Sequence, residues 1–253
     1  MHTPTLIDTA AERLLAAYPP GTMIAPPDDL PLNDLATAYA IQARVSAALG
    51  TPSGWKLGGI VRGEVPRYSR LLAEWSQASP GRVAHDAFHR VYLEPELAVV
   101  LGAAIPARQS PYALAEIAPR VASLHAAIEL VDSRFTVWPE VPPLWQLADG
   151  LSHGAFVLGS GVSAGDLSQM KDAAYHLTLD GAVALRGRGE HPGGDPAELL
   201  VAMINDRIRR DGGGFAAGEV ITTGTFDGVV EMRVGQRACL EFAGIGEVEL
   251  RLE

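Results

Sequence analysis

The sequence has only one cysteine among its 253 residues, Cys239, which lies in an apolar segment near the C-terminal end. One cysteine cannot form an internal disulfide, so a disulfide-stabilised scaffold is excluded. We interpret Cys239 as a buried strand residue rather than as a nucleophile. A hydrophobic core has to stabilise the fold instead, and a chain of this length can bury a substantial one, as one large domain or as one domain with an appendage.

Leader-like segments and long apolar runs are also missing. Residues 1–8 contain neither a basic segment nor a long apolar segment, so we expect no signal peptide. No uncharged stretch approaches the length of a membrane-spanning helix. These absences predict a cytoplasmic protein that has no membrane partner.

Clusters of basic residues are absent as well. The formal net charge is −10, and neither sign of charge forms a long run. Nucleic acids and anionic membranes bind clustered Lys and Arg, so we expect neither as a partner. An anionic small substrate remains compatible with this charge, because one bound metal ion reverses the local field. The hydrophobic content of 47% argues against disorder.

The N-terminal third is expected to begin with helices and then to change to strands. A helix is predicted over residues 5–18, and a second one runs from a cap at Asn33 to Gly50. Residues 54–59 read as a short strand that leads into a glycine loop. Residues 60–90 show little pattern, and we expect them to form a long excursion.

The remaining two thirds are predicted to be rich in strands. A helix is expected over residues 111–125, with His125 as a structural residue at its end. Asp180-Gly181 between two strand-like segments predicts a two-residue hairpin. Asp195 and Pro196 are typical of the start of a helix, and short strands follow. The whole pattern predicts an α+β fold that is mostly antiparallel in its C-terminal half.

Two glutamates interrupt an otherwise apolar strand at residues 91–101. Side chains two apart on a strand share a face, so Glu94 and Glu96 lie side by side, opposite the apolar face. Such a pair could face solvent or bind an arginine. Pro95 between them cannot donate to a strand ladder and favours an edge or a bulge. Buried together, the two carboxylates would need a cation.

Two further residues strengthen the case for a buried site. Glu129 lies in the apolar run 126–131, where a lone carboxylate needs a partner, either Arg134 or a shared cation. Three carboxylates on neighbouring strands would suit Mg²⁺ or Mn²⁺. Lys56 could extend to the surface, as lysines usually do. A buried Lys56 would instead be able to move protons.

Six motifs occur in an order and at a spacing that resemble a known family. They are Gly-Trp-Lys-Leu-Gly at 54–58, Glu-Pro-Glu at 94–96, Ala-Ile-Glu-Leu-Val-Asp-Ser-Arg at 127–134, the segment 147–159, Gly-Asp-Pro at 194–196 and Ile-Thr-Thr-Gly at 221–224. Together they resemble the 2-keto-4-pentenoate hydratase / 4-oxalocrotonate decarboxylase branch of the fumarylacetoacetate hydrolase superfamily. The resemblance extends from about residue 5 to the end of the sequence.

This resemblance implies a fold, a metal site and a class of substrate. The implied fold is a mixed β-roll of the fumarylacetoacetate hydrolase C-terminal-domain type over residues 81–253, with residues 1–80 as an N-terminal helical and loop segment. The implied substrate is a short 2-oxo or 2-hydroxydienoic acid from aromatic-compound breakdown. A homo-oligomer is expected, and a complex with a sister enzyme of the pathway is an open alternative.

The resemblance also assigns roles to individual residues. Mg²⁺ or Mn²⁺ would be held by Glu94, Glu96 and Glu129, and Lys56 would be the proton shuttle. The predicted substrate-binding residues are Leu57, Gly58, Arg62 and Thr223. His153 lies in a matched motif, and we expect it to support the site rather than to react.

The sequence departs from the family pattern after the lysine. The family commonly has Pro-Asp-Tyr-Gly where this chain has Pro-Arg-Tyr-Ser, with Arg67 in the place of the acid. Glu64 and Glu74 are weak candidates to replace that acid. Arg62 and Arg67 could bind a second substrate carboxylate or could be solvated. These departures keep open a catalytically weakened homologue that binds a small acid or stabilises a partner enzyme. A C–C bond hydrolase of a 2,4-dioxo acid is the alternative with the same fold, because the metal ligands alone do not choose among hydration, decarboxylation and C–C cleavage.

Overall fold

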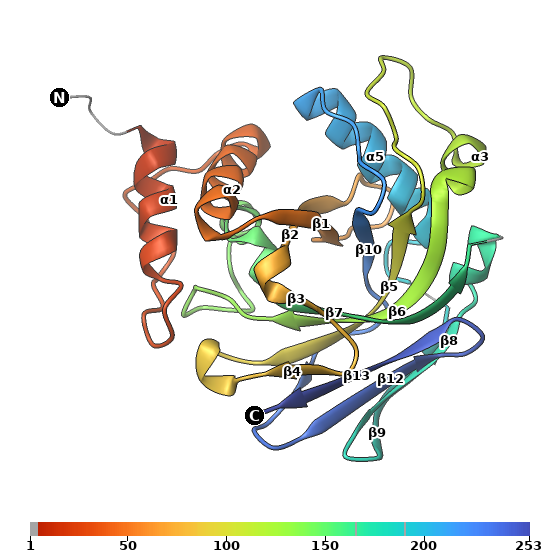
Figure 1. Ribbon diagram of the computed structural model, residues 1–253. Coiled ribbons are helices and arrows are strands. Elements are labelled where there is room, and N and C mark those ends of the chain that lie inside the picture. Colours follow the sequence, from red (N-terminus) through yellow and green to blue (C-terminus); the bar gives the residue numbers. More distant parts are fainter. Residues whose placement is uncertain (1–4, 165, 190) are drawn as a thin grey trace.

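Two β-sheets form the centre of the protein, as Figure 1 shows for the computed structural model, which describes residues 5–164, 166–189 and 191–253. The larger sheet has eight strands in the order β2-β1-β10-β5-β6-β7-β3, with β11 also paired to β5. Its strands are β1 Pro52–Gly58, β2 Arg67–Leu72, β3 Ser76–Ala78, β5 Tyr92–Leu101, β6 Val121–Val131, β7 His153–Ser163, β10 Val220–Thr225 and β11 Val230–Glu231. The smaller sheet, in the order β4-β13-β12-β8-β9, consists of β4 Gly81–Val83, β8 Ala174–Leu179, β9 Ala182–Arg188, β12 Arg237–Phe242 and β13 Gly246–Leu252.

Helices cover the ends of these sheets rather than alternating with the strands. They are α1 Leu6–Ala16, α2 Leu35–Leu49, α3 Leu114–Ile117, α4 Pro143–Ala148 and α5 Pro196–Asp211. Helices α1, α2 and α4 contact one another beside β2, and α5 contacts β10 (Figure 1). The predicted α+β class is therefore confirmed.

The main hydrophobic core uses one face of β5. Leu93, Leu97, Val99 and Leu101 are buried in it together with residues of the smaller sheet such as Leu240. The intervening residues of β5 point to the opposite face, as the two-residue period of a strand requires. The predicted apolar face of this strand is confirmed, and the glutamates are left on the other face.

Two predicted segments have a different structure. The helix expected over 111–125 is limited to the four residues of α3 and a short 3₁₀ turn, because Pro119 cannot continue a helix. From Val121 onward the chain is β6, held by ladders to β5 and β7, so His125 lies on a strand. The excursion expected over 60–90 is also wrong, because it contains β2, β3 and β4.

Local signals predicted other elements well. The Asp180-Gly181 hairpin is confirmed between β8 and β9, and both residues have the positive φ that this turn needs. Helix α5 begins after Asp195, whose side chain accepts from the backbone of Ala197, and ends at Gly212 with a φ of 70°. Helix α2 is capped by Asp34, one residue after the predicted cap.

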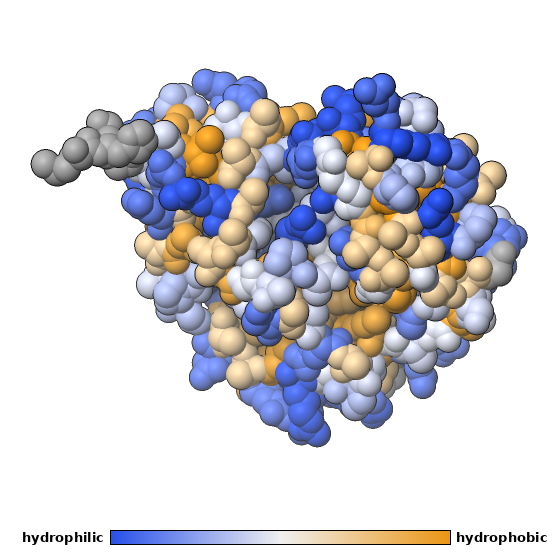
Figure 2. Space-filling model, turned by 45° about the horizontal axis from the view of Figure 1, so that its top comes forward, coloured by the Kyte–Doolittle hydropathy of each residue, from blue (hydrophilic) through white to orange (hydrophobic). Residues whose placement is uncertain are grey.

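The strands on either side of residue 80 belong to one sheet. Strands β1 and β3 precede this position and pair with β10 and β7, which follow it, and β2 pairs with β1. The division into residues 1–80 and 81–253 stays a prediction. None of the described helices is both long and apolar enough to cross a membrane. On the face shown in Figure 2, hydrophilic residues are mixed with small apolar patches.

Candidate metal centre and active site

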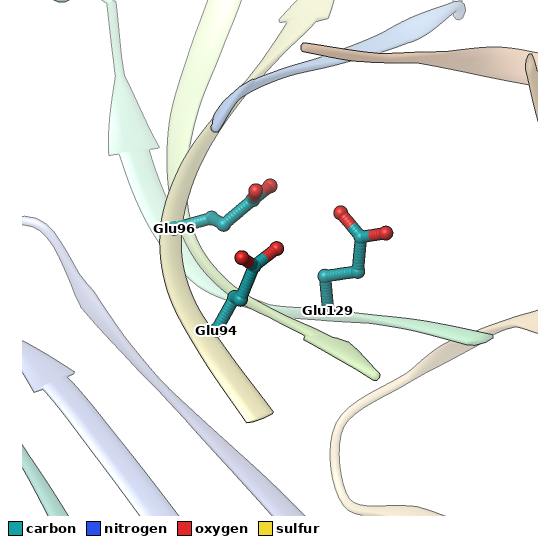
Figure 3. A group of neighbouring side chains, drawn as sticks. All are labelled: Glu94, Glu96 and Glu129. Carbon is teal, nitrogen blue, oxygen red and sulfur yellow. The ribbon is translucent and has the colours of Figure 1, made fainter. Parts of the chain in front are cut away.

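Three carboxylates converge on the face of the larger sheet that turns away from the main core. Strands β5 and β6 are antiparallel, and their register places Glu94 directly opposite Glu129. Glu96 lies two residues further along β5, on the same face. One carboxylate oxygen from each residue lies within 4.8 Å of the others. Figure 3 shows the side chains from the two strands pointing toward one another.

The environment of these carboxylates fits a hard divalent cation. Glu96 and Glu129 are 0% exposed. In the described structure, neither oxygen of Glu96 has a hydrogen-bond partner. The Oε2 atom of Glu129 also lacks one. A buried charged oxygen without a partner is costly, and three carboxylates are the donor set that Mg²⁺ and Mn²⁺ prefer. Glu94, Glu96 and Glu129 therefore fit the predicted metal.

The electrostatics of the group make its members unequal. Burial and the neighbouring charge of Glu129 raise the pKa of Glu94 to about 7. Burial, Glu129 and Glu94 raise the pKa of Glu96 well above its usual range. Burial acts in the same direction on Glu129, but the charge of Lys56 and a hydrogen bond from His153 outweigh it and lower the pKa of that carboxyl. Glu129 is thus the permanent anion, and the other two readily hold protons until a cation binds.

We predict that metal binding stabilises the protein more as the pH rises. The pKa of Glu94 lies at about 7 in the folded state, above its ordinary value of 4.5, so its contribution to stability is complete below pH 4.5 and is lost as the pH rises through 7. A cation replaces the proton and removes this loss. Thermal unfolding between pH 5 and 8, with and without Mg²⁺, should show a difference in Tm that widens with pH. A difference that is constant across this range would contradict the prediction.

Lys56 reaches the carboxylates from β1. Strand β10 lies between β1 and β5, and the side chain of Lys56 is only 2% exposed. Its Nζ atom forms an ion pair with Oε1 of Glu129 and donates to the carbonyl of Leu151 at 3.1 Å. Burial alone would lower the pKa of Lys56, but the charges of Glu129, Glu94 and Glu96 together raise it. The lysine is a cation held beside the carboxylates, not a surface side chain.

The turn before β7 brings backbone into the site. Leu151 and Ser152 both have a φ of 59°, a left-handed conformation that costs energy for residues other than glycine. This turn directs the Leu151 carbonyl at Lys56. Gly58 makes room for it, because a Cβ atom at Gly58 would lie 3.2 Å from the Leu151 side chain. The turn was not predicted from the sequence, in which neither residue is of the type that favours positive φ.

His153 follows this turn and contacts the same carboxylate as Lys56. Its Nδ1 atom lies 3.0 Å from Oε1 of Glu129, and both side chains are buried. Because a carboxylate only accepts hydrogen bonds, Nδ1 carries the proton. Oε1 of Glu129 is therefore occupied by two donors, and Oε2 remains for a metal. Sequence patterns alone could not have placed His153 against Glu129.

We predict that His153 sets the orientation of Glu129. His153→Leu removes one donor from Oε1, so the carboxylate can rotate, and affinity for Mn²⁺ should fall by about 10–100-fold, as it does when partners of metal ligands are lost. His153→Asn can still donate and should lose less. Mn²⁺ titration followed by electron paramagnetic resonance measures this. His125→Leu is the control, because His125 lies on β6 with Glu129 but is hydrogen-bonded to Gly159 and Ser123. Equal affinities in all four proteins would refute the role.

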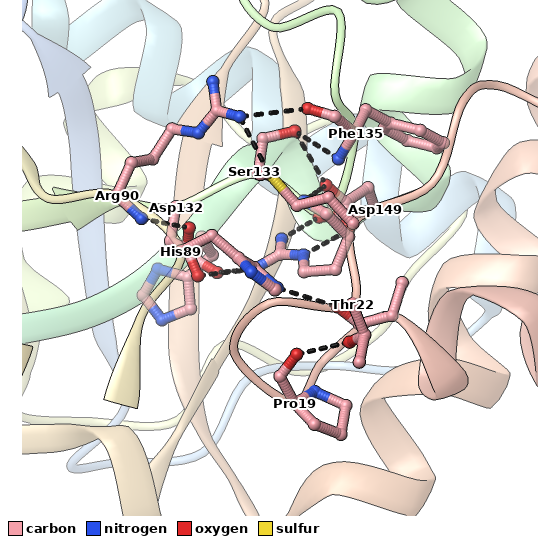
Figure 4. A network of polar contacts seen from close by, with 12 residues as sticks. Pro19, Thr22, His89, Arg90, Asp132, Ser133, Phe135 and Asp149 are labelled. Atoms are coloured by element: carbon pink, nitrogen blue, oxygen red, sulfur yellow. Dashed lines mark hydrogen bonds and ion pairs between the residues drawn. The ribbon is translucent and has the colours of Figure 1, made fainter. Parts of the chain in front are cut away.

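A buried ion pair anchors the segment that connects β6 to this turn. Arg134 is 1% exposed, and its Nε atom lies 2.5 Å from Oδ1 of Asp149. Arg134 also donates to the carbonyl of His153 at 2.8 Å. Figure 4 shows Asp149 within a wider network that includes Asp132 and Arg90. Arg134 therefore supports the 149–153 turn and is not the partner of Glu129.

The predicted substrate-binding residues have different surroundings. The side chain of Leu57 is buried in the main core. Thr223 is also buried, and its hydroxyl donates to the carbonyl of Leu97 at 3.1 Å. Arg62 is exposed in the loop between β1 and β2. Next to Thr223, the Thr222 hydroxyl lies beside Glu96 and partly offsets the rise in the pKa of that carboxyl. The four predicted substrate contacts stay predictions.

Glu64 and Glu74, the candidates to replace the acid of the family pattern, lie outside the ion-pair network of Lys56. Glu74 accepts from the backbone of Thr51 at 2.8 Å, and Glu64 is exposed in a loop. Arg67 donates to the carbonyl of Pro143 at 3.1 Å, which ties the start of β2 to α4. Glu129 is the acid that pairs with Lys56.

The chain matches a known family over most of its length. A model of the fumarylacetoacetate (FAA) hydrolase C-terminal family matches residues 74–253, and the chain belongs to this family. Within it, the chain is 29% identical over 256 residues to the 2-keto-4-pentenoate hydratase of Burkholderia vietnamiensis (strain G4 / LMG 22486), covering 96% of this chain and 95% of the relative. The resemblance predicted from the six motifs is confirmed.

Solved structures agree on the fold. The 4-oxalocrotonate decarboxylase from Pseudomonas putida G7, complexed with magnesium and adipate, superposes with a TM-score of 0.87 at 22% identity and covers 100% of both chains. The fumarylpyruvate hydrolase from Pseudomonas aeruginosa, in complex with Mn²⁺ and pyruvate, gives a TM-score of 0.58 at 17% identity, covering 80% of this chain and 89% of that one. The predicted β-roll fold is confirmed.

Proposed function

We propose that the protein is a divalent-metal-dependent lyase, a hydratase or decarboxylase, that acts on a short 2-oxo or 2-hydroxydienoic acid of aromatic-compound catabolism. The observation that carries this proposal is the group of Glu94, Glu96 and Glu129, of which Glu96 and Glu129 are fully buried, with Lys56 ion-paired to Glu129. The similarity to a 2-keto-4-pentenoate hydratase over nearly the whole chain supports the substrate class. Candidate substrates are 2-hydroxypenta-2,4-dienoate and 4-oxalocrotonate.

The residues of the site divide the work between binding and proton transfer. Glu94, Glu96 and Glu129 would hold Mg²⁺ or Mn²⁺, which as a Lewis acid favours negative charge on the 2-oxygen of a 2-oxo acid. Lys56, anchored by Glu129 and the Leu151 carbonyl, would deliver a proton to carbon or remove one. Burial of the group excludes bulk water, which strengthens each of these interactions. Leu57, Gly58, Arg62 and Thr223 are proposed to contact the substrate.

One contact bears on the hydrolase alternative. A histidine–glutamate pair that activates water would favour cleavage of a 2,4-dioxo acid, and His153 does contact Glu129. Glu129, however, belongs to the metal group and already accepts from Lys56, so the pair is not a separate base. The weakened homologue would be favoured if Lys56 pointed away from the carboxylates, which is not observed. The lyase is therefore the preferred function.

The assay that tests this proposal uses purified protein with Mg²⁺. The dienol absorbance of 2-hydroxypenta-2,4-dienoate and of 4-oxalocrotonate is followed together with release of CO₂, which separates hydration from decarboxylation. A 2,4-dioxo acid is the third substrate. Turnover of the third substrate alone would replace the lyase by the hydrolase. Turnover that survives EDTA would remove the metal from the proposal.

The proposal also covers the oligomeric state, the location and the partners of the enzyme. We expect a homo-oligomer in the cytoplasm, with a sister enzyme of the pathway as an open partner, and neither nucleic acid nor membrane as a partner. Size-exclusion chromatography with light scattering measures the oligomeric state directly.

A further inference from the structure

A hollow lies on the face of the β1–β2 pair opposite to Lys56. It has a volume of about 460 Å³ and lies between α2, the β1–β2 pair and the C-terminal end of α5. Four alanines of α2 form an apolar wall, and the remaining lining includes Tyr39, Trp55, Arg70 and Arg210. A volume in this range suits a small molecule.

Arg70 is a cation without a partner in this hollow. Its guanidinium lies flat on the indole of Trp55, 3.5 Å from the ring centroid. The guanidinium forms no hydrogen bond or ion pair with any part of the chain that the structure describes. Burial and the nearby charge of Arg207 lower the pKa of Arg70 to about 10. The charges of Glu219 and Asp211 act in the opposite direction, and an added anion would stabilise the half-buried guanidinium further.

The local acids are already used by other groups. Asp211 lies 3.0 Å from Nε of Arg210 and 3.7 Å from Nε of Arg207, so it serves two arginines. Glu219 accepts from the indole of Trp55 at 2.9 Å and from the backbone of Ala216. Of the charged residues that line the hollow in the described structure, two are arginines, Arg70 and Arg210, and one is an acid, Asp211.

A second guanidinium lines the same hollow. Arg210 lies flat on the ring of Tyr39, 3.4 Å from its centroid, and its Nη1 atom is buried without a hydrogen-bond partner. In both arginines an aromatic ring covers a face of the guanidinium. The N–H groups lie at the edge of each plane, where a carboxylate binds, and in Arg210 two of these nitrogens already contact Asp211.

We propose that this hollow is a binding site for a small organic carboxylate, whose anionic end is held by Arg70 and Arg210 and whose apolar body lies against the alanines of α2. It is separate from the metal group, because Trp55 and Lys56 are consecutive on β1 and point to opposite faces. The register pairs Trp55 with Arg70 and Lys56 with Ser69. This site does not depend on the proposed function.

Calorimetric titration of the full-length, Mg²⁺-loaded protein with benzoate tests the proposal, with inorganic phosphate as a second probe. We expect saturable binding of benzoate, weakened about tenfold or more by Arg70→Met and less by Arg70→Lys, which keeps the charge but loses the planar fork. Phosphate, which has no apolar body, should bind more weakly. Arg209→Met, an exposed neighbour on α5, is the control and should bind as the unchanged protein does.

Two further measurements separate this site from others. Binding should persist in Glu96→Gln and with EDTA, and loss of binding in either would place the benzoate at the carboxylate group and overturn the proposal. Binding that is equal in Arg70→Met and the unchanged protein would also overturn it, provided that both have the same Tm. If no binding occurs and Arg70→Met dissociates an oligomer, the hollow is occupied by a second copy of the chain, and the proposal is wrong.

Discussion

Glu96→Gln is expected to abolish metal-dependent turnover while leaving the metal-free protein at least as stable as before. The carboxylate of Glu96 is fully buried, and neither of its oxygens has a partner in the described structure. Gln is nearly the same size but has no charge, so it cannot balance a divalent cation. We expect kcat to fall by roughly 10²–10³-fold and the affinity for Mg²⁺ to fall with it.

The stability of Glu96→Gln should move in the other direction from its activity. Burial, Glu129 and Glu94 raise the pKa of Glu96, which means that its charged form is unfavourable in the metal-free fold. Removing that charge should therefore maintain or raise the Tm without metal and reduce the increase in Tm that Mg²⁺ causes. Differential scanning calorimetry with and without Mg²⁺ measures both.

A carboxylate far from the site provides the control for Glu96→Gln. Glu241 is an exposed strand residue of the smaller sheet, and Glu241→Gln makes the same chemical change there. It should leave turnover and the response to Mg²⁺ unchanged. If Glu96→Gln retains the full response to Mg²⁺, the three glutamates are not the metal ligands.

Lys56→Met is expected to separate metal binding from catalysis. Lys56 is the cation that compensates the buried charge of Glu129. Removing one partner of a buried ion pair typically costs about 3–5 kcal/mol in the free energy of unfolding, because the other charge is left uncompensated. A bound cation can take over that compensation, so Mg²⁺ should raise the Tm of this variant at least as much as that of the unchanged protein.

Turnover of Lys56→Met should nevertheless be lost. Proton transfer by a positioned side chain contributes about 10²–10⁴-fold to a rate, and we expect kcat to fall within this range. The chain has only one other lysine, the exposed Lys171, so Lys171→Met is a matched control and should retain full activity. Normal turnover in Lys56→Met would exclude the lysine as the proton shuttle.

A double-mutant comparison tests the pairing itself. In Glu129→Gln the lysine loses its counter-charge, and in Lys56→Met the glutamate does. The double variant leaves neither charge alone, so it should be less destabilised than the sum of the two single variants. Strict additivity of the three free energies of unfolding would mean that Lys56 and Glu129 do not interact.

Part of the site could be predicted from the sequence, because side chains alternate between the two faces of a strand. Side chains two apart share a face whatever the strand packs against, so Glu94 and Glu96 could be assigned to one face from the sequence. The apolar residues of the opposite face, such as Leu93 and Leu97, are buried in the main core, as expected. The same local logic predicted the Asp180-Gly181 hairpin and the start of α5, because turn and cap residues act on their own backbone.

The local sequence pattern did not determine the secondary structure of residues 111–125. Its Ala and Leu content is compatible with a helix, but Pro119 interrupts it and the ladders of β6 to two neighbouring strands hold the rest extended. The three strands within residues 60–90 were missed for a related reason. Two of them, β3 and β4, are only three residues long and exist because longer strands pair with them.

By itself, then, the sequence determined which residues carry charge into an apolar environment and which face of β5 they share, since both depend on residue type and on the two-residue period of a strand. The tertiary structure decided what those charges meet. It brought Lys56 to Glu129 across 73 residues by placing β10 between β1 and β5. It also directed His153 and the Leu151 carbonyl into the same group through a left-handed turn. Such contacts depend on strand order and on a turn whose energy is compensated by the rest of the fold, and neither is encoded in a local pattern.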